Sequence, residues 1–111
     1  MNLRDEKESG FVIVFASGSI DAVTSPNLEK HLSAFVEEGE TRLILDLTDV
    51  DYISSAGLKA ILKTRQRLQK EGKLIVTRPQ KWVAEVFRMA GFAAIVTIQD
   101  DLETAKREIM E

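Results

Sequence analysis

Short runs of consecutive apolar residues alternate along the chain with segments in which apolar residues recur every three or four positions. The run at residues 11–16, FVIVFA, lies between glycines and predicts a central strand buried on both faces. Residues 42–47 (RLILDL) and 73–77 (KLIVT) have the same character. Weaker patterns predict an edge strand at residues 3–8 and a last strand at residues 94–98.

Helical spacing follows two of these strands. Ser25 and Pro26 open a first helix, with the serine as N-cap and the proline at the first helical position, and this helix ends before Gly39. A second helix follows residues 54–55, and its apolar stripe continues to Gly72, a natural C-terminal stop. Each of these helices therefore connects two predicted strands.

A third helix is predicted from Pro79 to Gly91, and Asp101 can cap a fourth. The third helix turns its apolar residues inward: Val83, Val86, Phe87 and Ala90. The order β-β-α-β-α-β-α-β-α predicts an α/β fold with a mixed, mostly parallel sheet of four or five strands flanked by about four helices. With 111 residues we expect one domain, residues 1–111. Its functional edge lies at the carboxyl ends of the parallel strands.

Two adjacent hydroxyl residues, Ser54 and Ser55, stand at a strand-to-helix junction on this edge. A serine there commonly caps the helix by accepting a hydrogen bond from a free backbone N–H group of the first turn. The same N–H groups and the positive end of the helix dipole stabilise an added phosphate dianion. We expect Ser54 to cap the helix and Ser55 to present its hydroxyl as a phosphate acceptor.

Ala56 and Gly57 follow the serines and leave the first turn of the helix almost without side chains. Glycine lowers helix stability at such a position, so its presence indicates a close contact. Either another protein approaches the turn closely, or the helix packs tightly on its own sheet. The sequence leaves both explanations open.

Asp21 lies in the loop that leaves the first central strand, at the same edge of the predicted sheet. It either orients a hydroxyl or a metal-bound phosphate donor at the serine turn, or closes its own turn by accepting hydrogen bonds from nearby backbone N–H groups. The sequence does not decide between these two roles.

Composition excludes several classes of function. A net charge of −3, without a basic stripe that has interleaved aromatic residues, argues against a nucleic-acid partner. Zero cysteines and one histidine leave no disulfide, no thiolate catalysis and no expected metal site. The charged start MNLRDEKESG and the lack of an apolar run near the ~18 residues of a membrane span predict a cytoplasmic protein with no membrane partner.

The sequence lacks the residue combinations that an enzyme needs. No nucleophile has an adjacent base, no pair of carboxylates marks an acid–base site, and no glycine-rich loop is suited to cradle a phosphate. We therefore expect no catalytic residues and no cofactor.

Four motifs together carry a resemblance to a known family. They are GSID after the first central strand, LDLTDV before the serine turn, ISSAGL at the turn and FRMAGF late in the chain. Their combination and the order of the elements resemble the STAS domain over nearly the whole chain. Within that family the chain is most similar to the bacterial anti-sigma factor antagonists.

The resemblance implies a partner-switching protein. Its unphosphorylated form would bind an anti-sigma factor that is also a serine kinase and thereby free a sigma factor, phosphorylation would release the kinase, and a phosphatase would reset the switch. The family acceptor lies two positions before the motif glycine Gly57, which selects Ser55 here, with Asp21 beside it and Ser54 supporting it. A partner fitted against this helix would contact Ala56, Lys59, Ala60 and Lys63.

Three positions depart from the common pattern of the family. Ser54 stands where many phosphorylated relatives carry an aspartate, Ala56 where a second hydroxyl is frequent, and Lys59 where a small residue is frequent. The surface offered to a partner therefore differs in size and charge. An alternative function is a phosphorylation-independent STAS module that acts as a scaffold or small-ligand sensor in a signalling or transport assembly.

Overall fold

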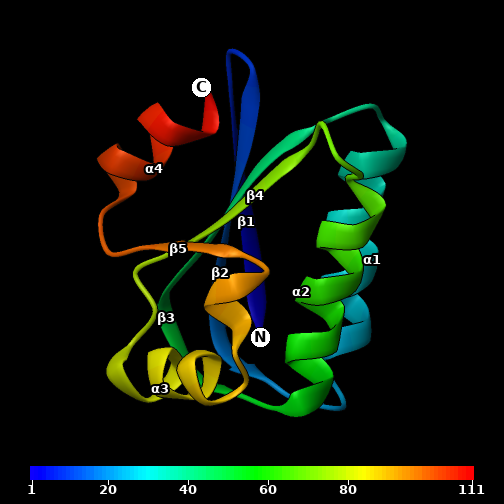
Figure 1. Ribbon diagram of the computed structural model, residues 1–111. Coiled ribbons are helices and arrows are strands. Elements are labelled where there is room, and N and C mark those ends of the chain that lie inside the picture. The colour runs from blue at the N-terminus through cyan, green and yellow to red at the C-terminus, as the bar shows by residue number, and fades with distance from the viewer.

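All five strands join one sheet in the order β1-β2-β3-β4-β5 in the computed structural model, which describes residues 1–111 (Figure 1). The strands are β1 (Asn2–Glu8), β2 (Phe11–Ile20), β3 (Arg42–Ile53), β4 (Lys73–Thr77) and β5 (Thr97–Gln99). β1 runs antiparallel to β2, and every other neighbouring pair is parallel. The carboxyl ends of β2 and β3 therefore lie at the same edge of the sheet.

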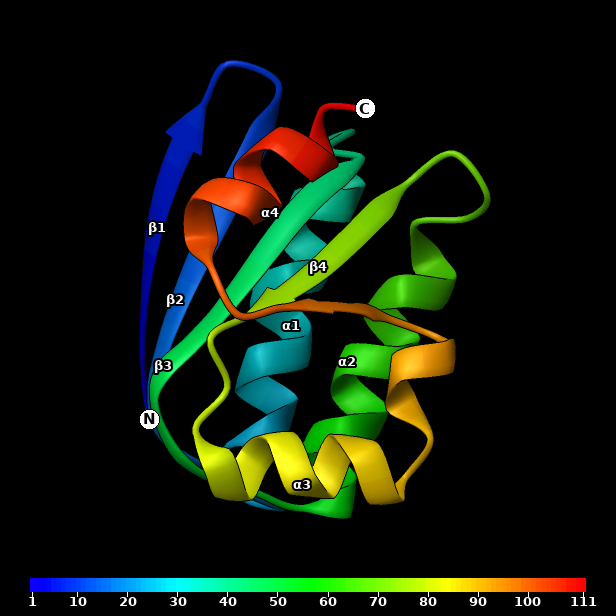
Figure 2. The ribbon, with the colours of Figure 1, turned by 60° about the vertical axis from the view of Figure 1, so that its left-hand side comes forward.

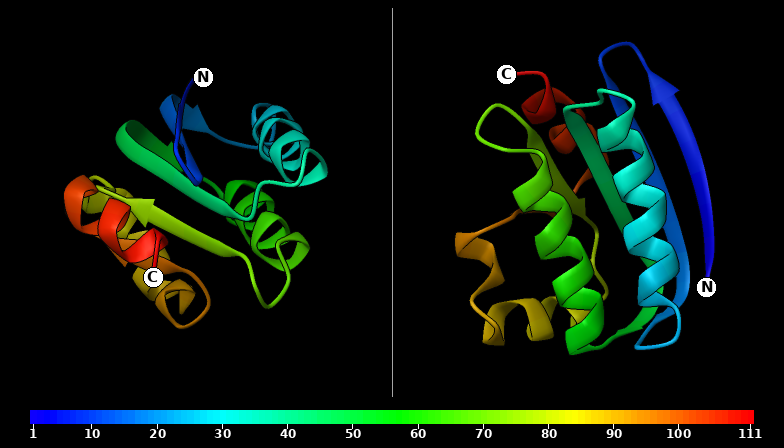
Figure 3. Two further views of the ribbon diagram at one scale, coloured as in Figure 1. Left: turned by 90° about the horizontal axis from the view of Figure 1, so that it is seen from above. Right: turned by 90° about the vertical axis from the view of Figure 1, so that its right-hand side faces the viewer.

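Four helices surround the sheet. α1 (Ser25–Glu37) and α2 (Ser55–Arg67) lie side by side on one face, and α4 (Leu102–Ile109) covers part of the other (Figure 2 and Figure 3). α3 (Lys81–Met89) lies across the end of the sheet where α1 and α2 begin, and the 3-10 turn η1 (Phe92–Ala94) follows it. No helix combines the length and the apolar character that a bilayer crossing requires. The predicted fold class and element order are confirmed.

The apolar runs are buried on both faces of the sheet, as their continuous pattern predicts. In β2, Val12 and Val14 belong to the main core with α1 and α2, whereas Phe11 and Ile13 belong to a smaller core with α4. Successive side chains of a strand point to opposite faces, so a strand between two helical layers is apolar at every position. Each fully buried side chain of this size stabilises the fold by about 1.5–3 kcal/mol.

β2 and β3 extend farther than the apolar pattern predicted. β2 continues to Ile20 and β3 to Ile53, because their last residues pair with each other beyond the end of β4. In the added part of β3 only Val50 and Ile53 are buried, and register shifts interrupt the pairing. The exposed polar positions between them break the apolar run, so this part of the strand gave no clear signal.

One predicted boundary of α1 and one of α2 are wrong. Ser25 is the first residue of α1 rather than its N-cap, and Thr24 holds the cap position. α2 ends well before Gly72, because Gln69 adopts the left-handed conformation with φ of 61°. Gly72 instead lies against Leu68, where a Cβ atom would come within 2.5 Å of the Leu68 carbonyl oxygen.

The third helix and the last strand begin later than predicted. Pro79 precedes the N-cap of α3 instead of opening the helix. Gly91 ends α3 with φ of 69°, and Phe92 turns back into the core, where its ring stacks on Phe87 at a centroid distance of 5.3 Å. The turn η1 therefore includes Ala94, the first residue of the strand predicted at residues 94–98, and β5 covers only Thr97–Gln99.

A buried carboxylate ties β3 to β4. The side chain of Asp46 is 3% exposed and accepts hydrogen bonds from Thr77 Oγ1 at 2.8 Å, Arg78 Nε at 2.9 Å and Thr48 N at 3.2 Å. Burial raises the pKa of this carboxyl, but the hydrogen bonds outweigh burial, and the pKa lies below its ordinary value. The interaction fixes Arg78, which has φ of 50°, at the start of the loop that leads to α3.

Asp46→Asn is expected to destabilise the fold by about 1–3 kcal/mol at neutral pH, because it weakens hydrogen bonds at a buried position. The pKa of Asp46 is lowered in the folded state, so its contribution is complete above the unfolded value of about 3.9 and is lost as the pH falls through the lower folded value. Urea unfolding at several pH values should show that the difference in the free energy of unfolding between wild type and Asp46→Asn becomes smaller below pH about 4.

Asp49→Asn, at an exposed position of the same strand, is the control and should leave the free energy of unfolding nearly unchanged. If the difference in the free energy of unfolding between wild type and Asp46→Asn stays constant down to low pH, the assigned role of the Asp46 carboxylate is contradicted.

Candidate functional site

The chain leaves β3 and enters α2 through the two serines. Ser54 is the N-cap of α2, with φ of −97° and ψ of 174°, and its Oγ accepts a hydrogen bond from Gly57 N at 3.3 Å. Ser55 is the first residue of the helix and is exposed. The structure thus uses Ser54 as the cap, as predicted, and leaves the Ser55 side chain accessible.

Gly57 determines how closely α2 approaches the sheet. It is buried, and a Cβ atom at this position would lie 2.7 Å from Cγ2 of Ile20 and 2.7 Å from Cγ1 of Ile53. Carbon atoms in good contact are about 3.5–4.0 Å apart, so no larger residue fits without displacement. Of the two explanations that the sequence left open, tight packing of the helix on its own sheet is the one observed.

The end of β2 is hydrogen-bonded to the serine turn. Ile20 O accepts a hydrogen bond from Ser54 N at 2.8 Å. The next residue, Asp21, accepts through Oδ1 from Val23 N at 2.9 Å and from Thr24 N at 3.0 Å. The hydrogen bond from the Thr24 N–H is the main cause that lowers the pKa of Asp21. Asp21 therefore closes its own turn, which lies next to the serines, and makes no hydrogen bond to either of them.

The outward face of α2 carries only part of the predicted partner surface. Lys59 and Lys63 are exposed and Ala56 is half-buried. Ala60 is wrong as a contact residue: it is 1% exposed, because it lies one turn after Gly57 on the buried side of the helix. Lys63 Nζ lies 3.8 Å from Oε1 of Glu29 in α1, whereas Lys59 makes no ion pair.

Comparison with known proteins identifies the family. The family model of the STAS domain matches residues 2–105. The chain belongs to the STAS domain family. The resemblance seen in the sequence motifs is confirmed, and the matched segment includes the serine turn, the whole sheet and all helices except the end of α4.

Relatives of this STAS domain are anti-sigma factor antagonists. BtrV of Bordetella bronchiseptica, which is named as one, is 37% identical over 106 residues that cover 95% of this chain and 91% of BtrV. An anti-sigma factor antagonist of Mycobacterium paratuberculosis has a structure with a TM-score of 0.93 and 27% identity, covering 99% of this chain and 94% of that one. The names describe regulators rather than enzymes, and this chain falls in the anti-sigma factor antagonist branch of the family.

A more distant relative has the same fold. The anti-sigma factor antagonist SpoIIAA of Bacillus matches in its unphosphorylated form with a TM-score of 0.76 and 18% identity, covering 98% of each chain. The structure of SpoIIAA in its phosphorylated form has a TM-score of 0.74. At this identity the likeness establishes the shared STAS fold.

Two exposed aromatic residues beside the site of this STAS domain were missed from the sequence. Tyr52, shortly before Ser55, is 53% exposed, and Trp82 of α3 is 79% exposed. Both line a hollow of about 340 Å³. Val86, which the helical pattern placed in the core, is only half-buried and lines the same hollow. The available signal was the position of Trp82, the sole tryptophan, directly before the inner stripe at Val83.

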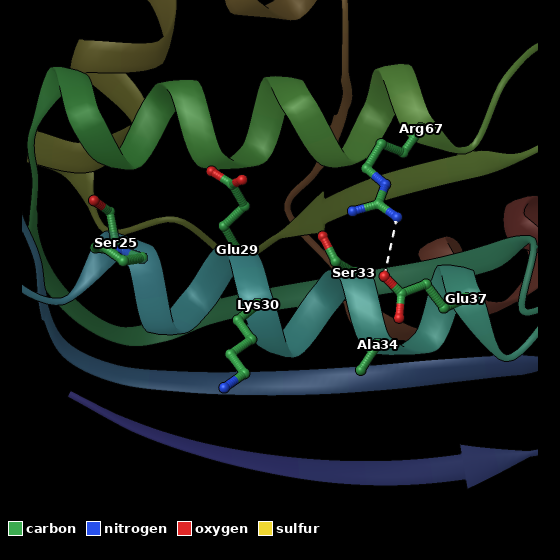
Figure 4. A pocket seen from close by; sticks show the side chains of 8 residues that line it. Ser25, Glu29, Lys30, Ser33, Ala34, Glu37 and Arg67 are labelled. Atoms are coloured by element: carbon green, nitrogen blue, oxygen red, sulfur yellow. Dashed lines mark hydrogen bonds and ion pairs between the residues drawn. The ribbon is translucent and has the colours of Figure 1, made fainter.

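A second hollow of about 490 Å³ lies between α1 and α2 of the STAS domain (Figure 4). Its charged residues serve the packing of the two helices: Arg67 Nη2 lies 3.3 Å from Glu37 Oε1, and Glu29 pairs with Lys63. Lys30 points away from α2 in this view. The hollow therefore offers no cluster of unpaired charge to a ligand, and the serine turn is the better candidate site.

The two serines of the turn are expected to contribute differently to stability. Ser54→Ala removes the cap of α2 and should lower the free energy of unfolding by about 1 kcal/mol. Ser55→Ala, at an exposed position of the same turn, should change it by less than about 0.5 kcal/mol. Urea denaturation of both variants measures the difference, and equal losses would show that the capping role is wrongly assigned.

Proposed function

We propose that this chain is an anti-sigma factor antagonist that works by partner switching through Ser55. The unphosphorylated form binds an anti-sigma factor that is also a serine kinase, and so frees a sigma factor. Transfer of the ATP γ-phosphoryl group to Ser55 Oγ, with loss of the hydroxyl proton and release of ADP, separates the two proteins. A phosphatase then hydrolyses the phosphoserine to restore the hydroxyl. As a regulator of bacterial transcription, the chain would act in the cytoplasm.

The observation that carries the proposal is the exposed Ser55 at the first position of α2, beside a separate capping serine. The first hydrogen bond of the helix runs from Leu58 N to Ser54 O at 3.0 Å, so the N–H groups of Ser55 and Ala56 precede the helical ladder. These groups and the helix dipole favour a phosphate at Ser55. Because Ser54 already serves as the cap, modification of Ser55 leaves that hydrogen bond in place.

Two similar proteins support the proposed function. BtrV is named as an anti-sigma factor antagonist and matches nearly the whole chain. SpoIIAA, which shares the fold, has been solved in both phosphorylated and unphosphorylated forms. A phosphoryl switch is therefore compatible with this fold, and we assign it here to Ser55.

The switch works through charge at the contact surface. A phosphoserine adds about −1.5 to −2 charges and three acceptor oxygens. A partner seated on Ser55, Ala56 and Lys59 would meet this charge directly, with Lys63 at the edge of its contact. A difference of about 3 kcal/mol between the two states changes occupancy on the order of a hundredfold. No change of fold is needed, and Mg-ATP chemistry belongs to the kinase.

Ser55→Asp is expected to weaken binding of the purified anti-sigma factor kinase of the same host on the order of tenfold or more, because a carboxylate imitates part of the phosphate charge. Ser55→Ala should bind like wild type and accept no phosphate. Calorimetry gives the affinities, and incubation of the kinase with labelled ATP gives the phosphorylation.

Ser55→Asn is the matched control, since it has nearly the size and shape of Ser55→Asp without the charge. If Ser55→Asp binds as tightly as Ser55→Asn, charge does not drive release. If wild type and all variants bind equally and the kinase does not phosphorylate wild type, the phosphorylation-independent scaffold is the better description.

A further inference from the structure

α3 carries a second apolar stripe, and the two ends of this stripe are exposed. Val83 and Phe87 are buried and face the sheet, as an amphipathic helix requires. Trp82, Val86 and Met89 follow one another at intervals of four and three residues and so form a second stripe beside the first. Trp82 is 79% and Met89 77% exposed. Val86 between them is half-buried and packs partly against the core. Two exposed apolar residues on one face, including the largest side chain of the chain, indicate a contact surface.

This outer stripe of α3 is continuous with the serine turn. The hollow of about 340 Å³ between α3 and the end of β3 is lined by Asp51, Tyr52, Ile53, Trp82, Val83 and Val86. Tyr52 is followed by Ile53, Ser54 and Ser55, and three residues of chain span at most about 11 Å. α3 and the start of α2 also lie at the same end of the molecule (Figure 1 and Figure 2).

A stable partner needs more surface than α2 offers. Specific protein interfaces bury about 800 Å² on each partner and involve about 20–30 residues a side. The turn contributes the small residues Ser55 and Ala56 together with lysines. Most binding energy in interfaces comes from a few residues, among which Trp, Tyr and Arg are enriched. The face of α2 around the acceptor has no aromatic residue, so the anchors must lie beside it.

The two flanks of α2 differ in what they offer. Toward α1, charged residues are already paired with one another, as Lys63 is with Glu29 and Arg67 with Glu37. Toward α3, the surface is apolar and aromatic. The core of an interface is depleted in charge and enriched in aromatic residues, which favours the α3 side.

We propose that the docking surface for the anti-sigma factor kinase has two parts. The first is the serine turn of α2, and the second consists of the outer stripe of α3 and the hollow that Tyr52 and Trp82 line, with Trp82 as the anchor. This inference rests on the proposed function, because it assigns the occupant to the partner that reaches Ser55. The kinase places an apolar side chain between Tyr52 and Trp82 and sets a carboxylate against Lys59, which has no ion pair in the free chain. Trp82 then anchors the partner, and the phosphorylation state of Ser55 determines whether the partner remains bound.

The single tryptophan gives a direct test. The full chain is labelled with 5-fluorotryptophan, so that its fluorine NMR spectrum has one resonance, from position 82. In the free chain this resonance should be fully open to a soluble paramagnetic probe. Addition of the purified kinase should shift the resonance and protect it from the probe. Binding of the kinase without either effect would overturn the proposal.

Substitution tests the anchor independently. Trp82→Ala should weaken kinase binding by at least about tenfold, and its exposure predicts little effect on folding. Met110→Ala is the control. Met110 is 45% exposed and follows α4 near the C-terminus, which lies at the opposite end of the molecule from α3 (Figure 1). Its substitution should change the affinity for the kinase by less than about twofold. Equal affinity of Trp82→Ala and wild type would contradict the proposal.

The outcomes separate this inference from the proposed function. If Ser55→Asp weakens binding and Trp82→Ala does not, the switch stands and the α3 surface is excluded. If the wild-type kinase does not bind at all, both are wrong. If the fluorine resonance becomes protected when the chain alone is concentrated, a second copy occupies the stripe and the kinase assignment is overturned.

Discussion

The absence of a side chain at Gly57 is the constraint on which the site depends. It lets the first turn of α2 lie directly on Ile20 and Ile53, at distances that a Cβ atom would forbid. Next to this contact, the Ser54 N–H donates a hydrogen bond to the carbonyl of Ile20, the last residue of β2, and so joins the end of β2 to the start of α2. Ser55 is thereby held at the outer edge of a rigid surface, where a change in its charge alters the surface without rearranging the fold.

The distribution of charge suits a switch of this kind. The chain has a net charge of −3, yet residues 55–70 contain five lysines and arginines and no acidic residue. Ion pairs with α1 occupy Lys63 and Arg67 and leave Lys59 free one turn after Ser55, the proposed acceptor. A phosphoserine one turn before Lys59 would reverse the local sign of the surface. The charge of this segment therefore has the opposite sign to the net charge of the chain.

The sequence was informative wherever a single local cause decides the structure. The caps Ser54 and Asp101 follow from the preference of free N–H groups for side-chain oxygens. Continuous apolar runs marked the buried strands because both faces are covered. Local rules failed where neighbouring residues compete for one position. Thr24 N donates a hydrogen bond to Asp21 Oδ1 and the Thr24 hydroxyl donates one to Ser19 O, and Thr24 rather than Ser25 holds the cap position of α1.

The candidate site contains residues that the sequence indicated and others whose position depends on the fold. The sequence indicates Ser55, Gly57 and the lysines of α2 as candidates because they lie close together in one short segment. The burial of Ala60 depends on how α2 packs on the sheet. Tyr52 and Trp82 line the same hollow because of where α3 lies. They are about thirty positions apart in the sequence, beyond the reach of helix or strand periodicity.

Phosphosite mapping by mass spectrometry on the chain isolated from its native host tests the central claim most directly. Trypsin releases residues 43–59, a peptide that contains both serines of the turn. We expect the fragment spectra to place one phosphoryl group on Ser55, at an occupancy that changes with growth conditions. A phosphoryl group on Ser54, or an unmodified peptide under all stressed and unstressed conditions, would contradict partner switching through Ser55.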